Sequence, residues 1–75
     1  PLEEPLVDQH TIRAFRILSL MEEGSDWRPA RAKSDVKADD VAAYKARVTK
    51  LVAGRASNMR ILDQVMFFLG KAAKA

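Results

Sequence analysis

The sequence predicts an all-α fold, a small three-helix bundle in a single helical domain that spans residues 1–75. Apolar residues recur at spacings of three and four along three segments, and no segment has the alternating pattern typical of a strand. Gly, Ser, Asp and Pro cluster between the first two segments, and Gly54 separates the last two. We expect helices at about 8–23, 35–53 and 57–73, with a long loop over 24–34.

The first helix has clear signals at both ends. Pro1 and Pro5 disfavour helix before them, and Asp8 is a good N-cap. Gly24 can adopt the left-handed conformation that commonly ends a helix. At about 100° per residue, one face collects the apolar residues that we expect to point inward: Val7, Ala14, Phe15, Leu18 and Met21.

The second helix follows a loop in which Pro29 and its neighbours oppose regular structure. Ser34 or Asp35 can cap this helix, and acidic residues in its first turns suit the helix dipole. We expect it to end near Gly54. Its narrow apolar stripe is typical of an outer helix and consists of Val41, Tyr44, Val48, Leu51 and Val52.

The third helix contains the most apolar stretch of the chain, RILDQVMFFLG at 60–70. Ser57 or Asn58 can cap it, and Lys71 and Lys74 suit its C-terminal end. About half of its circumference is apolar, wide enough to touch two neighbours. We expect these residues to point inward: Met59, Ile61, Leu62, Val65, Met66, Phe68, Leu69, Ala72 and Ala73.

One alternative joins the second and third helices. Their apolar residues share a heptad register that continues through Gly54, with Arg55 and Asn58 as a polar layer. A glycine inside a helix costs about 1 kcal/mol relative to alanine. Gly54 followed by a Ser cap fits a short connection between antiparallel helices, so we favour the hairpin over one long helix.

The amino-acid composition and the distribution of charge limit the kinds of function that we expect. Without cysteine, this short chain has no disulfides to supplement a small core, so partner binding is a plausible source of stability. Residues 1–26 carry a net charge of −4 and residues 27–75 a net charge of +7, for a total of +3. Such asymmetry can steer a partner of either sign. We expect an intracellular, most simply cytoplasmic, protein without a membrane span, either whole or one piece of a longer polypeptide.

The residues that enzymes and metal sites need are scarce. His10 is the only histidine, so neither a zinc tetrad nor a Cys-His nucleophile can form. Asp39 and Asp40 are adjacent, which places them poorly for a catalytic pair on a helix. Gly70-Lys71 lacks the upstream glycine of a phosphate-binding loop. We therefore expect no catalytic site, metal, cofactor or small-molecule substrate.

A surface for another protein is the preferred functional interpretation. Phe67 falls on the solvent side of the third helix, among Arg60, Asp63, Gln64, Lys71 and Lys74. Leu20 falls on the solvent side of the first helix, among Gln9, Arg13, Arg16 and Glu23, with Ile12 at the edge of the same surface. Aromatic side chains and arginines dominate binding hot spots, and burying a large apolar side chain is worth about 1.5–3 kcal/mol. We predict a protein-protein interaction module, an accessory subunit or adaptor, that binds another protein or a second copy of itself. The predicted contacts are Phe67, Leu20, Ile12 and Trp27, with Arg16 and Arg60 orienting the partner.

The alternative function is nucleic-acid binding. Trp27 lies beside several basic residues, a combination that can stack on a base and hold phosphates. The candidate contacts to a DNA or RNA backbone are Arg28, Arg31, Lys33 and Lys45. Neither later helix carries a recognisable recognition-helix motif, so we rank this function second.

Overall fold

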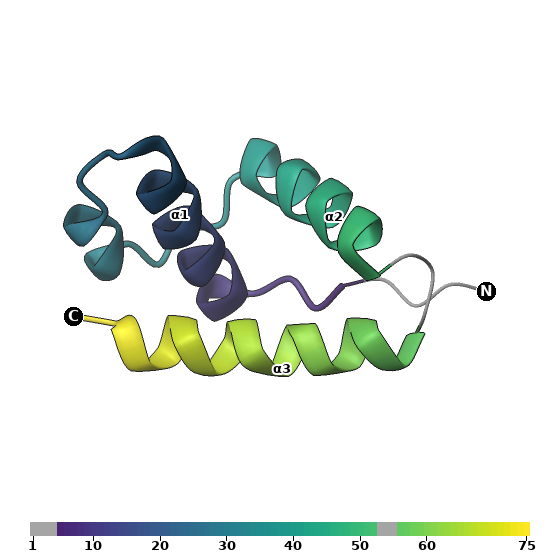
Figure 1. The fold of residues 1–75 in the computed structure, drawn as a ribbon. Coiled ribbons are helices and arrows are strands. Elements are labelled where there is room, and N and C mark those ends of the chain that lie inside the picture. Colours follow the sequence, from purple (N-terminus) through teal and green to yellow (C-terminus); the bar gives the residue numbers. More distant parts are fainter. Residues whose placement is uncertain (1–4, 53–55) are drawn as a thin grey trace.

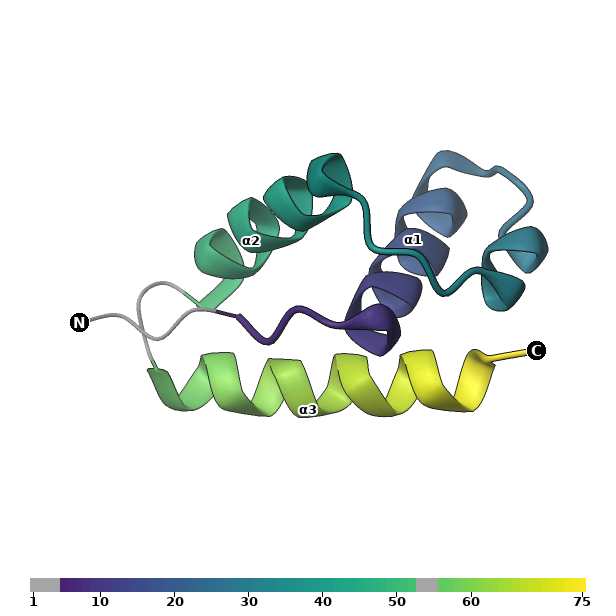
Figure 2. The same cartoon turned by 180° about the vertical axis from the view of Figure 1, so that it is seen from behind.

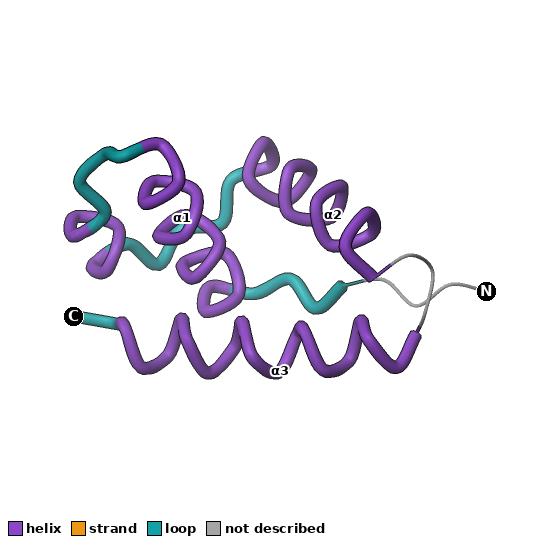
Figure 3. Tube along the Cα trace, viewed as in Figure 1, coloured by secondary structure: helices purple, strands orange, loops and turns teal. Residues whose placement is uncertain are grey.

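The computed structural model describes residues 5–52 and 56–75. In chain order the helices are α1 (Gln9–Glu23), the short 3-10 helix η1 (Arg28–Ala32), α2 (Ala38–Val52) and α3 (Ala56–Ala73). The views from both sides show α1 and α2 on the same side of α3 (Figures 1 and 2). The described residues form helices and loops and no strand (Figure 3). The predicted all-α three-helix fold is confirmed.

The chain reverses between α2 and α3 rather than continuing as one long helix (Figure 1). Gly54, where the second helix was expected to end, lies outside the described residues. Because α3 begins at Ala56, the expected caps Ser57 and Asn58 belong to its first turn. Its end at Ala73 agrees with the prediction.

Both ends of α1 are capped as the sequence predicts. The side chain of Asp8 accepts hydrogen bonds from the backbone N–H groups of His10 and Thr11, each at 2.9 Å. The Thr11 hydroxyl in turn accepts from the Asp8 N–H at 3.1 Å, which completes a capping box. At the other end, Gly24 adopts φ 74°, a left-handed conformation in which its N–H reaches the last carbonyls of the helix.

The start of α2 differs from the prediction. The helix begins at Ala38, and neither Ser34 nor Asp35 caps it. Both side chains instead contact arginines of α1: the Ser34 hydroxyl accepts from Arg13, and Asp35 pairs with Arg16. The loop is also more regular than expected, because η1 forms with proline near its start, where its missing N–H costs nothing.

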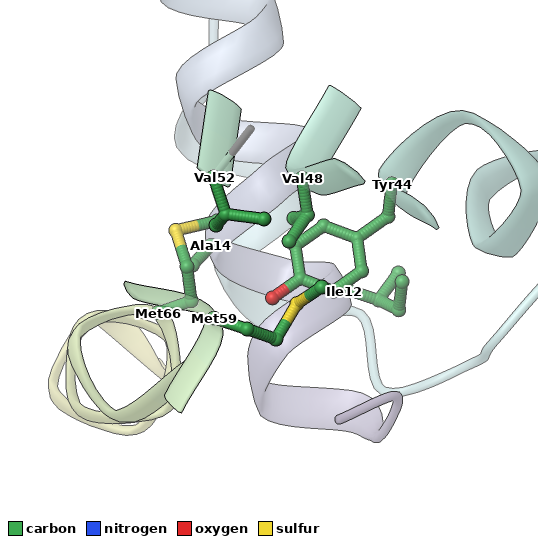
Figure 4. Close-up of a cluster of buried hydrophobic side chains, with 7 residues drawn as sticks. All are labelled: Ile12, Ala14, Tyr44, Val48, Val52, Met59 and Met66. Carbon is green, nitrogen blue, oxygen red and sulfur yellow. The ribbon is translucent and has the colours of Figure 1, made fainter. Parts of the chain in front are cut away.

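The hydrophobic core lies where α1 and α2 meet α3 (Figure 4). Its buried aliphatic and aromatic side chains come from all of these helices: Ile12 and Ala14 from α1, Tyr44, Val48 and Val52 from α2, and Met59 and Met66 from α3. The ring of Phe15 packs edge-on against Tyr44, with centroids 5.5 Å apart. In α2 the predicted inward face is confirmed except at Leu51, which is exposed.

A buried carboxylate joins α3 to α2 and to the segment before α1. Asp63 accepts a hydrogen bond from the Tyr44 hydroxyl at 3.1 Å and another from the backbone N–H of Leu6 at 2.8 Å. Burial, followed by the charge of Asp63 and this hydrogen bond, raises the pKa of Tyr44 well above its ordinary value of 10.0. Asp63 was expected on the solvent side, so its burial is a correction.

Arg13 is also buried, although it was expected among solvated residues of α1. Its guanidinium donates to the backbone carbonyls of Lys33 at 3.2 Å and Gly70 at 3.0 Å. It also donates to Nδ1 of His10 at 2.9 Å, because a guanidinium has no acceptor. One side chain thus connects α1 to the loop after η1 and to α3.

The same crossing requires glycine in α3. A Cβ built on Gly70 would overlap the backbone carbonyl of His10, because α1 and α3 approach at this point with no room for a side chain. The need for glycine here is steric, since the position is an ordinary helical one. Gly70 therefore sets which face of α3 meets α1.

We predict that Gly70→Ala destabilises the protein by about 1–3 kcal/mol, because the added methyl group forces backbone atoms apart. The sign is diagnostic, since Gly→Ala inside an ordinary helix stabilises by about 1 kcal/mol. Urea unfolding followed by circular dichroism measures the change. Gln64→Ala, at an exposed position of the same helix, is the control and should shift stability by less than about 0.5 kcal/mol. A more stable Gly70→Ala variant would contradict the close crossing.

Tyr44→Phe should lower stability near neutral pH by about 1–2 kcal/mol, because Asp63 loses a hydrogen-bond donor. The difference in the free energy of unfolding between wild type and Tyr44→Phe should become smaller above pH 10. Above pH 10, Tyr44, the only tyrosine of the chain, loses its proton in the unfolded wild-type chain but keeps it in the folded protein, where its pKa is raised. Rising pH therefore stabilises the unfolded state of wild type but not that of Tyr44→Phe. Urea unfolding of both proteins at about pH 8 and about pH 11 tests this. A constant or widening difference would contradict the buried Tyr44–Asp63 contact.

Candidate interaction surface

The face of α3 that packs on the protein is not the one its apolar residues predict. The buried positions are Met59, Asp63, Met66 and Gly70, which form one row along the helix. This row includes only one edge of the expected apolar half. The reason is local: α1 can approach closely only at Gly70, and Asp63 is held by hydrogen bonds from Tyr44 and Leu6.

This rotation leaves a row of large apolar side chains in solvent. They occupy positions spaced by four, three and one residues, within an arc of about 100° on the side of α3 turned away from the core. We call this row the α3 apolar stripe; it consists of Ile61 (60% exposed), Val65 (47%), Phe68 (70%) and Leu69 (46%). All were expected to point inward, and that expectation was wrong.

The stripe is bordered by hollows on both sides. On one side, a hollow of about 400 Å³ lies between Leu51 and Val52 of α2 and Ile61, Leu62 and Val65 of α3. A narrower groove of about 130 Å³ continues from Leu51 and Leu62. It extends toward α1, where it is lined by the partly exposed Leu18. Apolar surface therefore extends from α3 across the ends of α1 and α2.

On the other side, a hollow of about 400 Å³ contains two of the residues predicted to bind a partner, Phe67 and Arg60. Phe68 and Leu6 line it as well. Phe67 is partly buried, because its ring packs edge-on against His10 at 5.0 Å. The helical pattern predicted Phe67 on the solvent side of α3, and its partial burial corrects that prediction, although Phe67 also lines this hollow.

Two of the predicted contacts are unsuited to meeting a partner. Ile12 is completely buried in the core, so its expected place at the edge of a solvent-facing surface was wrong. Arg16 retains only 12% side-chain exposure, and its guanidinium binds Asp40 at 2.6 Å and Asp35 at 3.1 Å. Arg16 therefore joins α1 to α2 and to the preceding loop instead of projecting from the surface.

Leu20 and Trp27 lie in another part of the molecule. Leu20 is partly buried and lines a cleft of about 620 Å³ between α1, η1 and the start of α2, as does Arg16. Trp27 precedes η1, with the Arg28 guanidinium 5.6 Å above its ring. Four of the six predicted partner residues thus form two separate pairs, Phe67 with Arg60 and Leu20 with Arg16. Of the other two, Trp27 lies at the start of η1 and Ile12 lies in the core.

The candidate nucleic-acid contacts are partly engaged within the protein. Arg28 pairs with Asp26 at 3.3 Å, and Nε of Arg31 donates to the Ala73 carbonyl at 2.9 Å. Lys33 is exposed and lines the same cleft as Leu20, which four aspartates also line. Lys45 lies half-buried on α2. The carboxylates among these residues would repel phosphates.

Comparisons with protein-family models, curated proteins and solved structures found no match to this chain. Within the described part of the chain, no three His, Cys, Asp or Glu side chains come close enough to hold a metal ion. None of the helices seen in residues 5–52 and 56–75 is long and apolar enough to cross a membrane. Inference about function therefore depends on the chemistry of the surface.

Two neighbouring positions of α3 test which face is buried. Met66→Asp places a charge in the core and should unfold the domain, because Met66 is only 6% exposed. Val65→Asp should change stability by less than about 0.5 kcal/mol, since Val65 lies in solvent. Urea unfolding followed by circular dichroism measures both variants. The sequence pattern placed both residues inward, so comparable losses of stability would support that pattern and contradict the exposed stripe.

Proposed function

We propose that this protein is a non-enzymatic protein-protein interaction module, an accessory subunit or adaptor, that binds its partner through the α3 apolar stripe. The supporting observation is that four large apolar side chains of α3 are exposed within one arc of the helix, outside its buried row. Contiguous exposed apolar surface of this kind marks interaction sites in small proteins.

The shape of the surface agrees with helix-mediated recognition. Anchors spaced by four, three and one residues along α3 are typical of an amphipathic helix that inserts into a partner's groove or packs along a partner's helix. The hollows beside Leu51 and beside Phe67 can receive partner side chains from either edge. Fully buried anchors in such hollows account for most of the binding energy in protein interfaces.

The proposed function is of the kind that the sequence predicts, but the proposed binding surface is the α3 apolar stripe and not the residues that the sequence pattern selected. Phe67 and Arg60 remain at the edge of the surface, in the hollow next to Phe68. Ile12 and Arg16 are left out because the fold itself uses them. Nucleic-acid binding has less support, because the apolar stripe offers nothing to a phosphate backbone and two of its candidate arginines have partners inside the protein.

The proposal is tested by measuring whether one substitution in the α3 apolar stripe weakens the complex with a captured partner protein. The full chain captures binding proteins from a cell extract, a captured protein is identified by mass spectrometry, and the complex is re-formed from the two purified components. Val65→Asp should weaken this complex at least about tenfold, since burying an aliphatic side chain is worth about 1.5–3 kcal/mol.

The matched control is Val36→Asp. Val36 is 44% exposed, close to the 47% of Val65, but it lies in the loop before α2 and outside the stripe. This variant should bind like wild type. If the two variants bind equally well or equally poorly, the stripe is not the binding surface and the proposal is wrong.

A further inference from the structure

We infer that the partner at the α3 apolar stripe is a second copy of the chain, bound as an antiparallel pair of α3 helices with a two-fold axis at Val65. The inference rests on the proposed function and adds the identity of the partner. Val65 lies at the middle of α3 (Ala56–Ala73) and is 47% exposed. An antiparallel pair centred on Val65 therefore overlaps along nearly the full length of both helices.

The face of α3 centred on Val65 is uncharged on both sides of that residue. At about 100° per residue, the positions three, four and seven residues before and after Val65 lie within about 60° of its direction. These positions carry no charge, and all are exposed except the partly buried Leu62: Asn58, Ile61, Leu62, Phe68, Leu69 and Ala72. A two-fold interface requires such a self-complementary surface, because both copies contribute the same patch.

The two-fold axis brings residues at equal distances from Val65 to the same level along the pair. Val65 meets its own copy, Ile61 meets Leu69, and Asn58 meets the small Ala72. Successive contacts along each helix are then three or four residues apart, which is the spacing of helices that pack knobs into holes. The register thus pairs an apolar residue with another at each level except the outermost, where an amide meets a methyl group.

The shape of the surface agrees with this register. A hollow of about 400 Å³ lies beside Ile61 and Leu62, in the first half of the face, and Leu51 of α2 forms its far wall. The large exposed side chains of the second half are Phe68, at 70%, and Leu69, at 46%. The same axis places the second half of each copy against the first half of the other, so these side chains lie level with the hollow.

The basic residues of α3 remain outside the seam. Arg60 and Lys71 lie about 140° and 120° from the direction of Val65, so both extend away from a helix packed on that face. Pairing through Val65 therefore brings no like charges together. The antiparallel direction also sets the positive N-terminal end of each helix dipole beside the negative C-terminal end of the other, which favours this direction over a parallel pair.

The exposed apolar area is sufficient for a weak dimer. Taking about 150–250 Å² for a fully exposed large side chain, the exposed fractions of the stripe and of Leu51 amount to roughly 500 Å², about a tenth of the 5053 Å² surface. Specific interfaces cover about a tenth of a small protein, and the smallest stable ones bury about 600 Å² per partner. We therefore expect a dissociation constant between about 1 μM and about 1 mM.

The oligomeric state of the full chain tests the inference. Sedimentation equilibrium should show the mass of one chain at about 1 μM and of two chains at about 1 mM. Val65→Asp should weaken the dimer at least about 100-fold, because both copies lose the contact on the axis and each loss costs about tenfold. Val36→Asp, the matched control outside the stripe, should dimerise like wild type.

Cysteine cross-linking tests the antiparallel register, since the wild-type chain has no cysteine. Facing Cα atoms of helices packed about 8–10 Å apart come within the roughly 7 Å that a disulfide permits. Under mild oxidation, Val65→Cys should therefore link to its own copy. Asn58→Cys should link to Ala72→Cys but not to itself. Gln64→Cys, exposed but about 100° from Val65, is the control and should not link.

Several outcomes would overturn the inference. These are a single chain at every concentration, a dimer that survives Val65→Asp, and self-linking of Asn58→Cys, which requires parallel helices. A monomer that cosediments with phosphatidylglycerol vesicles, and no longer does so as Val65→Asp, would assign the stripe to a lipid surface instead. A monomer whose captured complex is lost in Val65→Asp, but not in Val36→Asp, would separate failure of this inference from failure of the proposed function.

Discussion

The guanidinium of Arg13, buried where α1 crosses α3, is bonded to several parts of the chain at once. Each of its N–H groups has an acceptor, and these acceptors come from α1, the loop after η1 and α3: Gln9, His10, Lys33, Ser34 and Gly70. None of them is a carboxylate. A buried cation without a counterion is tolerated only while every one of these dipoles is in place, because each lost bond leaves a charged donor unsolvated. The position of one helix thereby depends on the positions of the others.

That constraint decides the orientation of α3. The Gly70 carbonyl has to reach Arg13 while the Gly70 Cα has to lie against the backbone of His10, so this side of α3 must face α1. About two turns earlier in α3, Asp63 faces the same way and accepts hydrogen bonds from Tyr44 and from the segment before α1. The helix is therefore oriented by a glycine and a carboxylate, and its most apolar side is left outside.

The same orientation of α3 therefore determines both which of its side chains enter the core and which form the exposed α3 apolar stripe. Because α1 and α2 lie on the same side of α3 (Figure 2), the methionines at the edge of its apolar half reach the core, and the rest of that half remains in solvent. Ion pairs of Arg16 with the start of α2 keep α1 and α2 joined on that side. A partner that covered the α3 apolar stripe would complete the burial that the chain leaves unfinished.

The sequence alone was sufficient for the number and order of the three α-helices and for both ends of α1, but not for the start of α2 or for η1. Asp8 and Gly24 mark the ends of α1 because caps act through the nearest turn, and the α2 face around Tyr44 and Val48 follows from apolar spacing. The apolar half of α3 could also be foreseen, but it was expected to face the core, and most of its large side chains are exposed. That was decided by contacts between distant residues, chiefly Arg13 with Gly70 and Tyr44 with Asp63, whose polar or small side chains predict solvent exposure when each helix is considered separately. Hydrogen bonds and close backbone packing across helices reverse that expectation, since they exist only after the chain has folded.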